Sequence, residues 1–174
     1  NENLVSTASN TTLATTVSIT TQLLTFWAVY VPVASTITGV LYWITNGNAV
    51  STTTTGFNGF GLYTLSGSTL TRVAVTADSV NNWKSGGATN VQKIPFTATY
   101  SAAAGLYYIG MLACITGTLP SIRSMATNNQ ASTWGSIDMP SNFTCFQVSA
   151  QTTMPATQAM GVQVPISVYG SYLY

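Results

Sequence analysis

Side chains able to do acid–base chemistry are scarce in this sequence. The 174 residues include no histidine and only three aspartates or glutamates, whereas catalysis at neutral pH usually needs a histidine or a pair of carboxylates. Asp78 and Asp138 would form a glycosidase pair only if their carboxyl groups lay roughly 5–9.5 Å apart in a cleft, and nothing in the sequence indicates such a cleft. No serine sits in a nucleophile-elbow motif. We therefore predict no catalytic residue and no enzyme activity.

Metal and cofactor sites are equally unsupported. The two cysteines, Cys114 and Cys145, are too few for a zinc site, and three scattered carboxylates do not make the oxygen cage that calcium prefers. The glycine-rich stretch 56–61 lacks the dinucleotide-binding spacing and indicates a turn. We predict neither a metal nor a cofactor. Cys114 and Cys145 would form a disulfide, worth about 3–4 kcal/mol, if the strands on either side of the intervening loop were adjacent; two free buried thiols are the alternative.

The chain is almost uncharged, with 4% charged residues and a net charge of +1. Ordinary soluble domains carry about 25% charged residues, so the polar surface here must consist mainly of threonine, serine, asparagine and glutamine. Such a surface does not depend on ionic strength and suits an extracellular or particle-bound protein. The basic residues Arg72, Lys84, Lys93 and Arg123 are dispersed and form no stripe that could follow phosphates. We expect no nucleic acid partner.

The longest nearly unbroken apolar run, residues 102–115, is too short to span a membrane. A spanning helix needs about 20 apolar residues, and this run also contains two glycines and two tyrosines. We interpret it as a buried strand and expect no membrane insertion. The sequence begins at Asn1 without the basic segment and apolar run of a signal peptide, so we interpret it as a mature form or a fragment.

The hydrophobic pattern is that of an all-β protein. Runs rich in valine, isoleucine, threonine, tyrosine and phenylalanine alternate with clusters of glycine, asparagine and serine, and helical periodicity is absent. We predict strands at residues 22–31, 36–45, 59–65, 69–77, 91–100, 105–116, 144–150 and 161–172. About eight strands favour a two-sheet antiparallel β-sandwich, jelly-roll-like in its connections. Residues 21–174 would form this single domain, with a long loop at 117–143, and residues 1–20 an N-terminal linker or edge strand.

The clearest local signal is a hairpin at Ser66-Gly67-Ser68, because these turn residues lie between two β-prone runs. In the second run, Val73 and Val75 alternate with polar or small residues. This alternation predicts that the two valines share the buried face of the strand.

Three of the predicted strands, at 22–31, 36–45 and 105–116, are apolar on both faces, although a sandwich strand needs only one apolar face. The second face must be covered, and the expected cover is another copy of the chain. The interface residues that we predict are Leu23, Trp27, Val29, Val31, Trp43 and Tyr107. The alternative is that the N-terminal residues or the long loop of the same chain cover these faces.

Four sequence elements occur in order between residues 61 and 112. They are GLYTLSGSTLTRVA, the Asn-Trp-Lys at 82–84, the Phe-Thr-Ala-Thr-Tyr at 96–100 followed by an alanine-rich stretch, and the Gly-Leu-Tyr-Tyr at 105–108. This series, about a third of the chain, resembles a segment of phage virion proteins of the tail-fibre, head-fibre or receptor-binding type. The resemblance implies the framework of a β-sandwich tip displayed on a fibre, often trimeric. It does not extend before residue 36 or after residue 117, so it implies no receptor specificity.

Two loops are candidate receptor sites. Trp83 could stack on a sugar ring whose hydroxyl groups bond to neighbouring amides; the alternative is that it plugs the end of the sandwich, because it lies within the resembling segment. The loop at 117–143 is the second candidate, because it is long and polar and lies outside that segment; a role in oligomer packing is its alternative. The receptor-binding residues that we predict are Arg123, Asn128, Asn129, Trp134, Asp138 and Trp83.

Taken with the resemblance, these features favour a phage virion structural protein. It would be a fibre tip or surface spike on the particle exterior that attaches to the host without catalysis, through surface glycans. The expected partners are further copies of the chain, in a homotrimer, together with other virion proteins and a host surface glycan. The alternatives are an architectural capsid or decoration protein with no receptor role, and a secreted carbohydrate-binding module.

Overall fold

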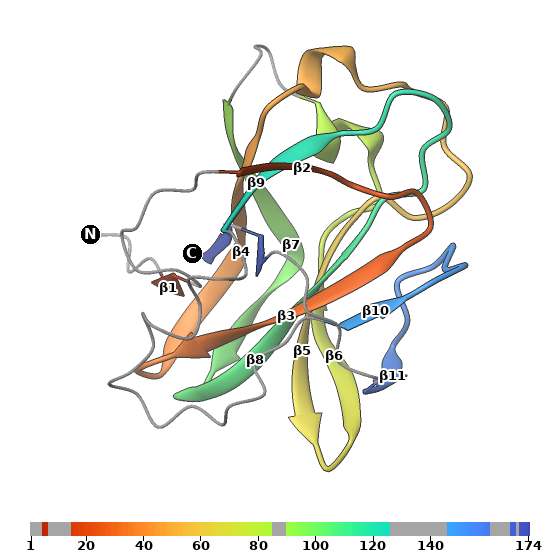
Figure 1. Cartoon of the computed structure of the whole chain (residues 1–174). Coiled ribbons are helices and arrows are strands. Elements are labelled where there is room, and N and C mark those ends of the chain that lie inside the picture. Colours follow the sequence, from red (N-terminus) through yellow and green to blue (C-terminus); the bar gives the residue numbers. More distant parts are fainter. Residues whose placement is uncertain (1–4, 7–14, 85–89, 126–145, 161–167, 170) are drawn as a thin grey trace.

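The computed structural model describes residues 5–6, 15–84, 90–125, 146–160, 168–169 and 171–174. In these ranges the chain forms two antiparallel β-sheets and two short 3-10 helices (Figure 1). The strands are β1 (Val5–Ser6), β2 (Thr15–Ser18), β3 (Leu24–Val31), β4 (Ser35–Ile44), β5 (Gly59–Ser66), β6 (Thr69–Val75), β7 (Asn90–Ala102), β8 (Gly105–Leu112), β9 (Ser121–Met125), β10 (Phe146–Val148), β11 (Thr157–Ala159), β12 (Val168–Tyr169) and β13 (Ser171–Leu173). The 3-10 helices are η1 (Gly47–Ala49) and η2 (Val80–Trp83). The predicted all-β sandwich is confirmed.

The strand order is that of a jelly roll. The seven-stranded sheet has the order β1-β13-β4-β9-β12, with β2 also paired to β9 and β7 to β4, and the six-stranded sheet has the order β10-β3-β8-β5-β6-β11. The strands from β2 to β9 thus form the quartets β2-β9-β4-β7 and β3-β8-β5-β6. Apart from the β5–β6 hairpin, each connection between successive strands of this set crosses from one sheet to the other, which is the jelly-roll arrangement.

The predicted strands up to residue 116, and the one at 144–150, coincide with observed strands whose ends differ by a few residues. The strand predicted at 161–172 contains β12 and β13, whereas its residues 161–167 and 170 lie outside the described ranges. β9 was not predicted, because it is only five residues long and three of them are polar. Of the two interpretations of residues 1–20, the described part supports an edge strand, since β2 pairs with β9 and β1 with β13.

The β5–β6 hairpin is confirmed, with Gly67 in the left-handed conformation at φ +58° that glycine adopts without steric cost. The alternation predicted for β6 is wrong. A bulge shifts the register of the two strands after Leu62, and a shift by one residue exchanges the faces of a strand. As a result Val75 packs on the outer side of the six-stranded sheet, whereas Val73 packs against the core between the sheets.

The core between the two sheets is one large apolar cluster. Its largest side chains are Trp27, Tyr42, Phe60 and Trp83, each exposed by 1% or less. Burying a large apolar side chain stabilises a fold by about 1.5–3 kcal/mol. This cluster is therefore the main source of the stability of the fold.

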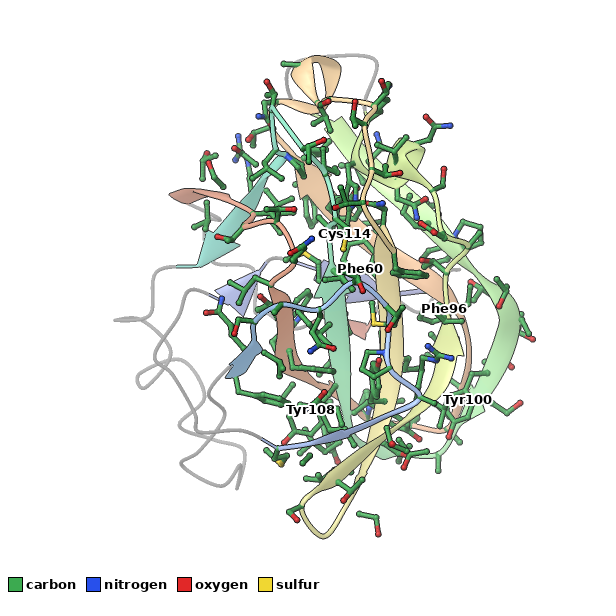
Figure 2. The ribbon with its side chains drawn as sticks, turned by 90° about the vertical axis from the view of Figure 1, so that its right-hand side faces the viewer. Phe60, Phe96, Tyr100, Tyr108 and Cys114 are labelled. Carbon is green, nitrogen blue, oxygen red and sulfur yellow. The ribbon has the colours of Figure 1, made fainter. Side chains whose placement is uncertain are left out.

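A second apolar cluster covers the outer side of the six-stranded sheet. It includes Leu24, Phe26, Tyr63 and Leu112, each fully buried. Residues 146–160, which we call the strap, cover this cluster from β10 beside β3 to β11 beside β6. Figure 2 looks onto this side, where the strap passes in front of the sheet. The expectation that another copy covers the outer side of β3 is therefore wrong at Leu24 and Phe26, which the same chain covers.

Polar contacts hold the strap along its length. The Tyr63 hydroxyl donates to the Pro155 carbonyl at 2.8 Å, and the Arg72 guanidinium donates to the Met154 carbonyl. Phe146 stacks on Phe26 with ring centroids 4.6 Å apart. The backbone of the strap pairs with β3 at one end and with β6 near the other, and its Phe146 ring is buried. The strap is therefore part of the folded domain and not a tail.

At one corner of the sandwich, β7 contacts both sheets. It pairs with β4 along most of its length, but the register shifts between Ile37 and Gly39. Pro95 lies beside this irregularity, where a missing N–H is tolerated. The next residue, Phe96, forms an isolated antiparallel bridge with Thr76, which directly follows β6. Phe96 is labelled in Figure 2. β7 therefore connects the two sheets.

Candidate binding surface

Trp83 is a core residue and is not accessible to a ligand. Its side chain is 0% exposed, and its ring lies 5.1 Å from the Phe60 ring and 5.8 Å from the Tyr42 ring, measured between centroids. The Ser79 hydroxyl caps η2 by accepting from the Asn81 amide at 3.2 Å. The prediction that Trp83 binds a receptor is therefore wrong, and the alternative, that it plugs the end of the sandwich, is confirmed.

The polar residues around this plug serve the fold. The Asn82 side chain donates to the carbonyls of Asn58 and Ala77, each at 2.9 Å. The Asn58 side chain in turn accepts from the Cys114 amide at 2.9 Å, and the Asn58 amide donates to the Asp78 carboxylate at 2.9 Å. Because buried polar groups are costly when left unpaired, this network fixes the loops at the end of the six-stranded sheet. Asp78 has a structural role in it.

Most of the predicted interface residues point into the molecule. Trp27, Val29, Val31 and Tyr107 belong to the core between the sheets and are 0–5% exposed. Their prediction as interface residues is wrong, because alternation along β3 and β8 directs them inward. Leu23 is partly buried just before β3, and Trp43 is partly buried on β4.

The loop predicted to bind a receptor is described only in part. Arg123 is exposed on β9. Asn128, Asn129, Trp134 and Asp138 lie outside the described residues, so their prediction as receptor-binding residues stays a prediction. Cys114 is a free thiol in the structure, so the alternative of a free buried thiol is confirmed for this residue, whereas Cys145 lies outside the described residues. Cys114 itself is buried, with its thiol donating to the Gln151 carbonyl at 3.4 Å.

The outer side of the seven-stranded sheet brings Trp43 and Arg123 to one surface. Ile44 on β4 and Ile122 on β9 pair directly, and both are buried in the core. Side chains alternate along a strand, so the preceding Trp43 and the following Arg123 face outward at adjacent positions. On the other side of β4, Trp43 pairs with Val91, which is 43% exposed.

A second aromatic ring and a second cation extend this surface. Lys93 lies on β7 two residues beyond Val91, and its Nζ is 5.0 Å from the centroid of the Tyr174 ring, a distance typical of a cation–π contact. The backbone of Tyr174 pairs with Gly39. A Cβ atom at Gly39 would clash with the Ile94 carbonyl oxygen on β7 and would lie 2.8 Å from the Tyr174 hydroxyl. The glycine therefore allows both β7 and the tyrosine ring to approach this position closely.

We call this surface the outer-face patch and define it by Trp43, Val91, Lys93, Arg123 and Tyr174. Its span along β4, from Gly39 to Trp43, is about 13 Å at roughly 3.3 Å per residue. Aromatic faces beside hydrogen-bond donors suit a sugar ring, which has an apolar face and a rim of hydroxyl groups. Sequence reasoning identified Arg123, but it missed Lys93 and Tyr174, because only strand pairing brings β7 and the residues after β13 together.

Several titratable groups of the described residues have pKa values raised by burial. Burial, and secondarily the charge of Asp78, raises the pKa of the Cys114 thiol, so this thiol is a poor nucleophile at neutral pH. Burial also raises the pKa of Tyr42, Tyr63 and Tyr108. In the described ranges, no three histidine, cysteine, aspartate or glutamate side chains are grouped so that they could hold a metal ion. None of the helices in these ranges has the length and apolar character to cross a membrane.

Comparisons with known proteins add no relative. No protein-family model matches the chain, and no curated protein matches it either. The function must therefore be argued from the fold and the outer-face patch.

Proposed function

We propose that this chain is a phage virion structural protein, a fibre tip or surface spike on the particle exterior, which attaches to the host by binding a surface glycan without catalysis. The observation that carries the proposal is the outer-face patch, where Trp43 lies next to the strand that carries Arg123 and Lys93 lies over the Tyr174 ring. The jelly-roll fold supports it, since viral capsid and lectin domains use this architecture. A fold alone does not determine a function, so the patch is the part to test.

The position of the resembling segment is consistent with this proposal. Residues 61–112 run from β5 to β8 and include η2 with its buried Trp83. These elements form the framework of the sandwich. Of the patch residues, Trp43, Arg123 and Tyr174 lie outside the segment, whereas Val91 and Lys93 lie within it.

The proposal includes self-association, with a trimer as the expected oligomer. An exposed apolar surface lies where the β3–β4 and β7–β8 connections are adjacent, because Val31 pairs with Gly105 and Ser35 with Ala102. We call this surface the apolar tip. It consists of Tyr30, Pro32, Val33, Ala34, Ala103 and Ala104, with Val33 55% exposed and Tyr30 38% exposed. Exposed apolar surfaces of this kind often contact other subunits.

A glycan array probed with the purified chain tests the attachment function. We expect binding to a subset of glycans, and we expect Trp43→Ala to abolish it because the stacking platform is lost. Thr71→Ala, an exposed position on β6 away from the patch, is the matched control and should bind as the unmodified chain does. Binding that survives Trp43→Ala would contradict the assignment to the patch.

The apolar tip also supports a second candidate function, an architectural capsid or decoration protein. In that case the tip would be buried against a neighbouring shell protein, and the chain would bind no glycan. Co-sedimentation with particles that lack the protein distinguishes the two functions. Tight particle binding without any binding to host cells would favour the architectural role, whereas a monomer that binds glycans would favour a secreted carbohydrate-binding module.

A further inference from the structure

We propose that the outer-face patch selects an acidic polysaccharide, in which carboxylates on separate sugar units contact Lys93 and Arg123 while sugar faces lie on Trp43 and Tyr174. This inference rests on the proposed glycan-binding function and names the class of glycan. Its basis is a concentration of charge, since two of the four cations in the whole chain lie in this patch.

The spacing of the two cations indicates a polymer rather than a single small acid. Arg123 on β9 and Lys93 on β7 flank β4 on opposite sides, which places their backbones about 10 Å apart at roughly 4.8 Å per strand. They are also offset by two residues along β4. Lys93 pairs with Leu41, whereas Arg123 follows Ile122, the partner of Ile44, and so lies at the level of Trp43. Acidic groups on separate sugar units can contact both cations without either side chain leaning toward the other.

The rings and the cations are arranged to act together. The contact between Lys93 and the Tyr174 ring, at 5.0 Å, holds an ammonium group next to an aromatic face. At the other end of the patch, Arg123 lies beside the Trp43 position. An acidic sugar offers both a hydroxylated ring for stacking and a carboxylate for a charge-assisted hydrogen bond. A neutral sugar would use only the rings.

The net charge of the chain does not oppose the binding of an anion. The net charge of the chain is +1, so long-range repulsion of an acidic polymer is absent. A nucleic acid is a poorer fit, because two cations on a flat sheet cannot follow a phosphate backbone.

Binding of the purified full chain to polygalacturonate, with its methyl ester as the neutral counterpart, tests the inference. Biolayer interferometry at low salt should show binding to the acid and at least tenfold weaker binding to the ester. Lys93→Gln and Arg123→Gln should each weaken binding to the acid about tenfold, the loss of roughly one charge-assisted hydrogen bond. Binding should also weaken as salt is raised, because screening reduces the attraction between exposed charges.

Lys84→Gln is the matched control, because it removes the same charge outside the patch. We expect its binding to change less than twofold. Equal weakening by Lys84→Gln would overturn the inference, since attraction by net charge would then explain the binding. All three positions are at least partly exposed, and an unchanged thermal unfolding midpoint verifies that each variant is folded.

The remaining outcomes separate this inference from the proposed function. If the chain binds neutral glycans through Trp43 and does not prefer the acid, the inference fails and the proposed function stands. If it binds neither acidic nor neutral glycans, both fail. If Lys93→Glu lowers the mass measured by light scattering and no polysaccharide binds, the patch is an interface between copies, and the inference is overturned.

Discussion

At the scale of single residues, two tryptophans have opposite environments. Trp83 is fully buried against Phe60 and Tyr42, whereas Trp43 is partly buried on the outer side of the seven-stranded sheet. Local sequence does not distinguish them. Trp83 follows a polar loop and was considered both as a receptor-binding residue and as a plug at the end of the sandwich, and Trp43 sits in an apolar run and was expected at an interface. The direction of each side chain depends on strand register and on the packing of η2.

This difference predicts different costs for the two alanine substitutions. Trp83→Ala should lower the free energy of unfolding by about 3–5 kcal/mol, because it leaves a cavity in the core. Trp43→Ala should cost clearly less and abolish glycan binding. Urea unfolding followed by far-UV circular dichroism measures both values. Similar costs for the two variants would show that the environments are not as distinct as described.

Buried tyrosines and Cys114 predict a loss of stability at alkaline pH. Burial raises the pKa of Tyr42 and Tyr63 above the ordinary value of 10.0, and that of Cys114 above 9.0. Above these ordinary values the unfolded chain releases protons that the folded chain retains, so the free energy of unfolding should fall as pH rises. The slope should approach about 1.4 kcal/mol per pH unit for each such group, and below about pH 9 these groups should add no pH dependence.

Urea unfolding between pH 8 and pH 11 measures this slope. Tyr63→Phe removes one of the groups, so the slope of that variant should be flatter than that of the unmodified chain above pH 10. A constant free energy of unfolding up to pH 11 would contradict the prediction.

At the scale of secondary structure elements, the strap replaces a partner. The second apolar side of β3 was correctly inferred to need a cover, but the cover is the strap of the same chain rather than another copy. The sequence signal of the strap is weak, since β10 and β11 have only three residues each. Their pairing with two edge strands far away in the sequence becomes evident only in the folded chain.

Weakening the strap should expose the outer apolar cluster without unfolding the sandwich. Phe146 is fully buried and stacks on Phe26, so Phe146→Ala should cost about 3–5 kcal/mol and increase the fluorescence of the dye ANS. Far-UV circular dichroism should change little. Thr153→Ala, at an exposed position in the strap, is the control and should leave ANS fluorescence unchanged. Loss of all β-structure in Phe146→Ala would show that the strap and the sandwich fold as one unit.

At the scale of the whole molecule, a nearly uncharged surface leaves self-association to shape and apolar contacts. With a net charge of +1, repulsion between copies is weak. The apolar tip places Val33, at 55% exposure, at one end of the sandwich. A self-contained fold does not require a partner, but this tip provides a surface for one.

A charge at the tip should therefore dissociate the expected trimer. Val33→Asp should reduce the mass measured by light scattering to that of one chain, because an oligomer would have to bury an unpaired carboxylate. Thr52→Asp is the control, because it adds the same charge at an exposed position far from the tip. Thr52 lies in the loop whose Thr54 bridges to Ile115, beyond the opposite end of β8. This variant should leave the mass unchanged. If the unmodified chain is already a monomer, or if Val33→Asp stays oligomeric, the tip is not the interface.

The sequence by itself determined the fold class, most strand positions and the scarcity of catalytic groups. Period-two patterns, turn residues and composition are local properties, so no tertiary contact is needed to read them. The hairpin at Gly67 is the clearest example. Even so, one bulge after Leu62 was enough to reverse the inferred face of Val75.

Only the tertiary structure decided which apolar faces are covered and which side chains share a surface. Trp43, Lys93 and Arg123 come from three strands, and their proximity depends on β4 pairing with both β7 and β9. The burial of Trp83 depends on contacts with strands that lie more than twenty residues earlier. Such juxtapositions arise from long-range pairing, and a local sequence pattern does not encode which distant strand becomes the neighbour.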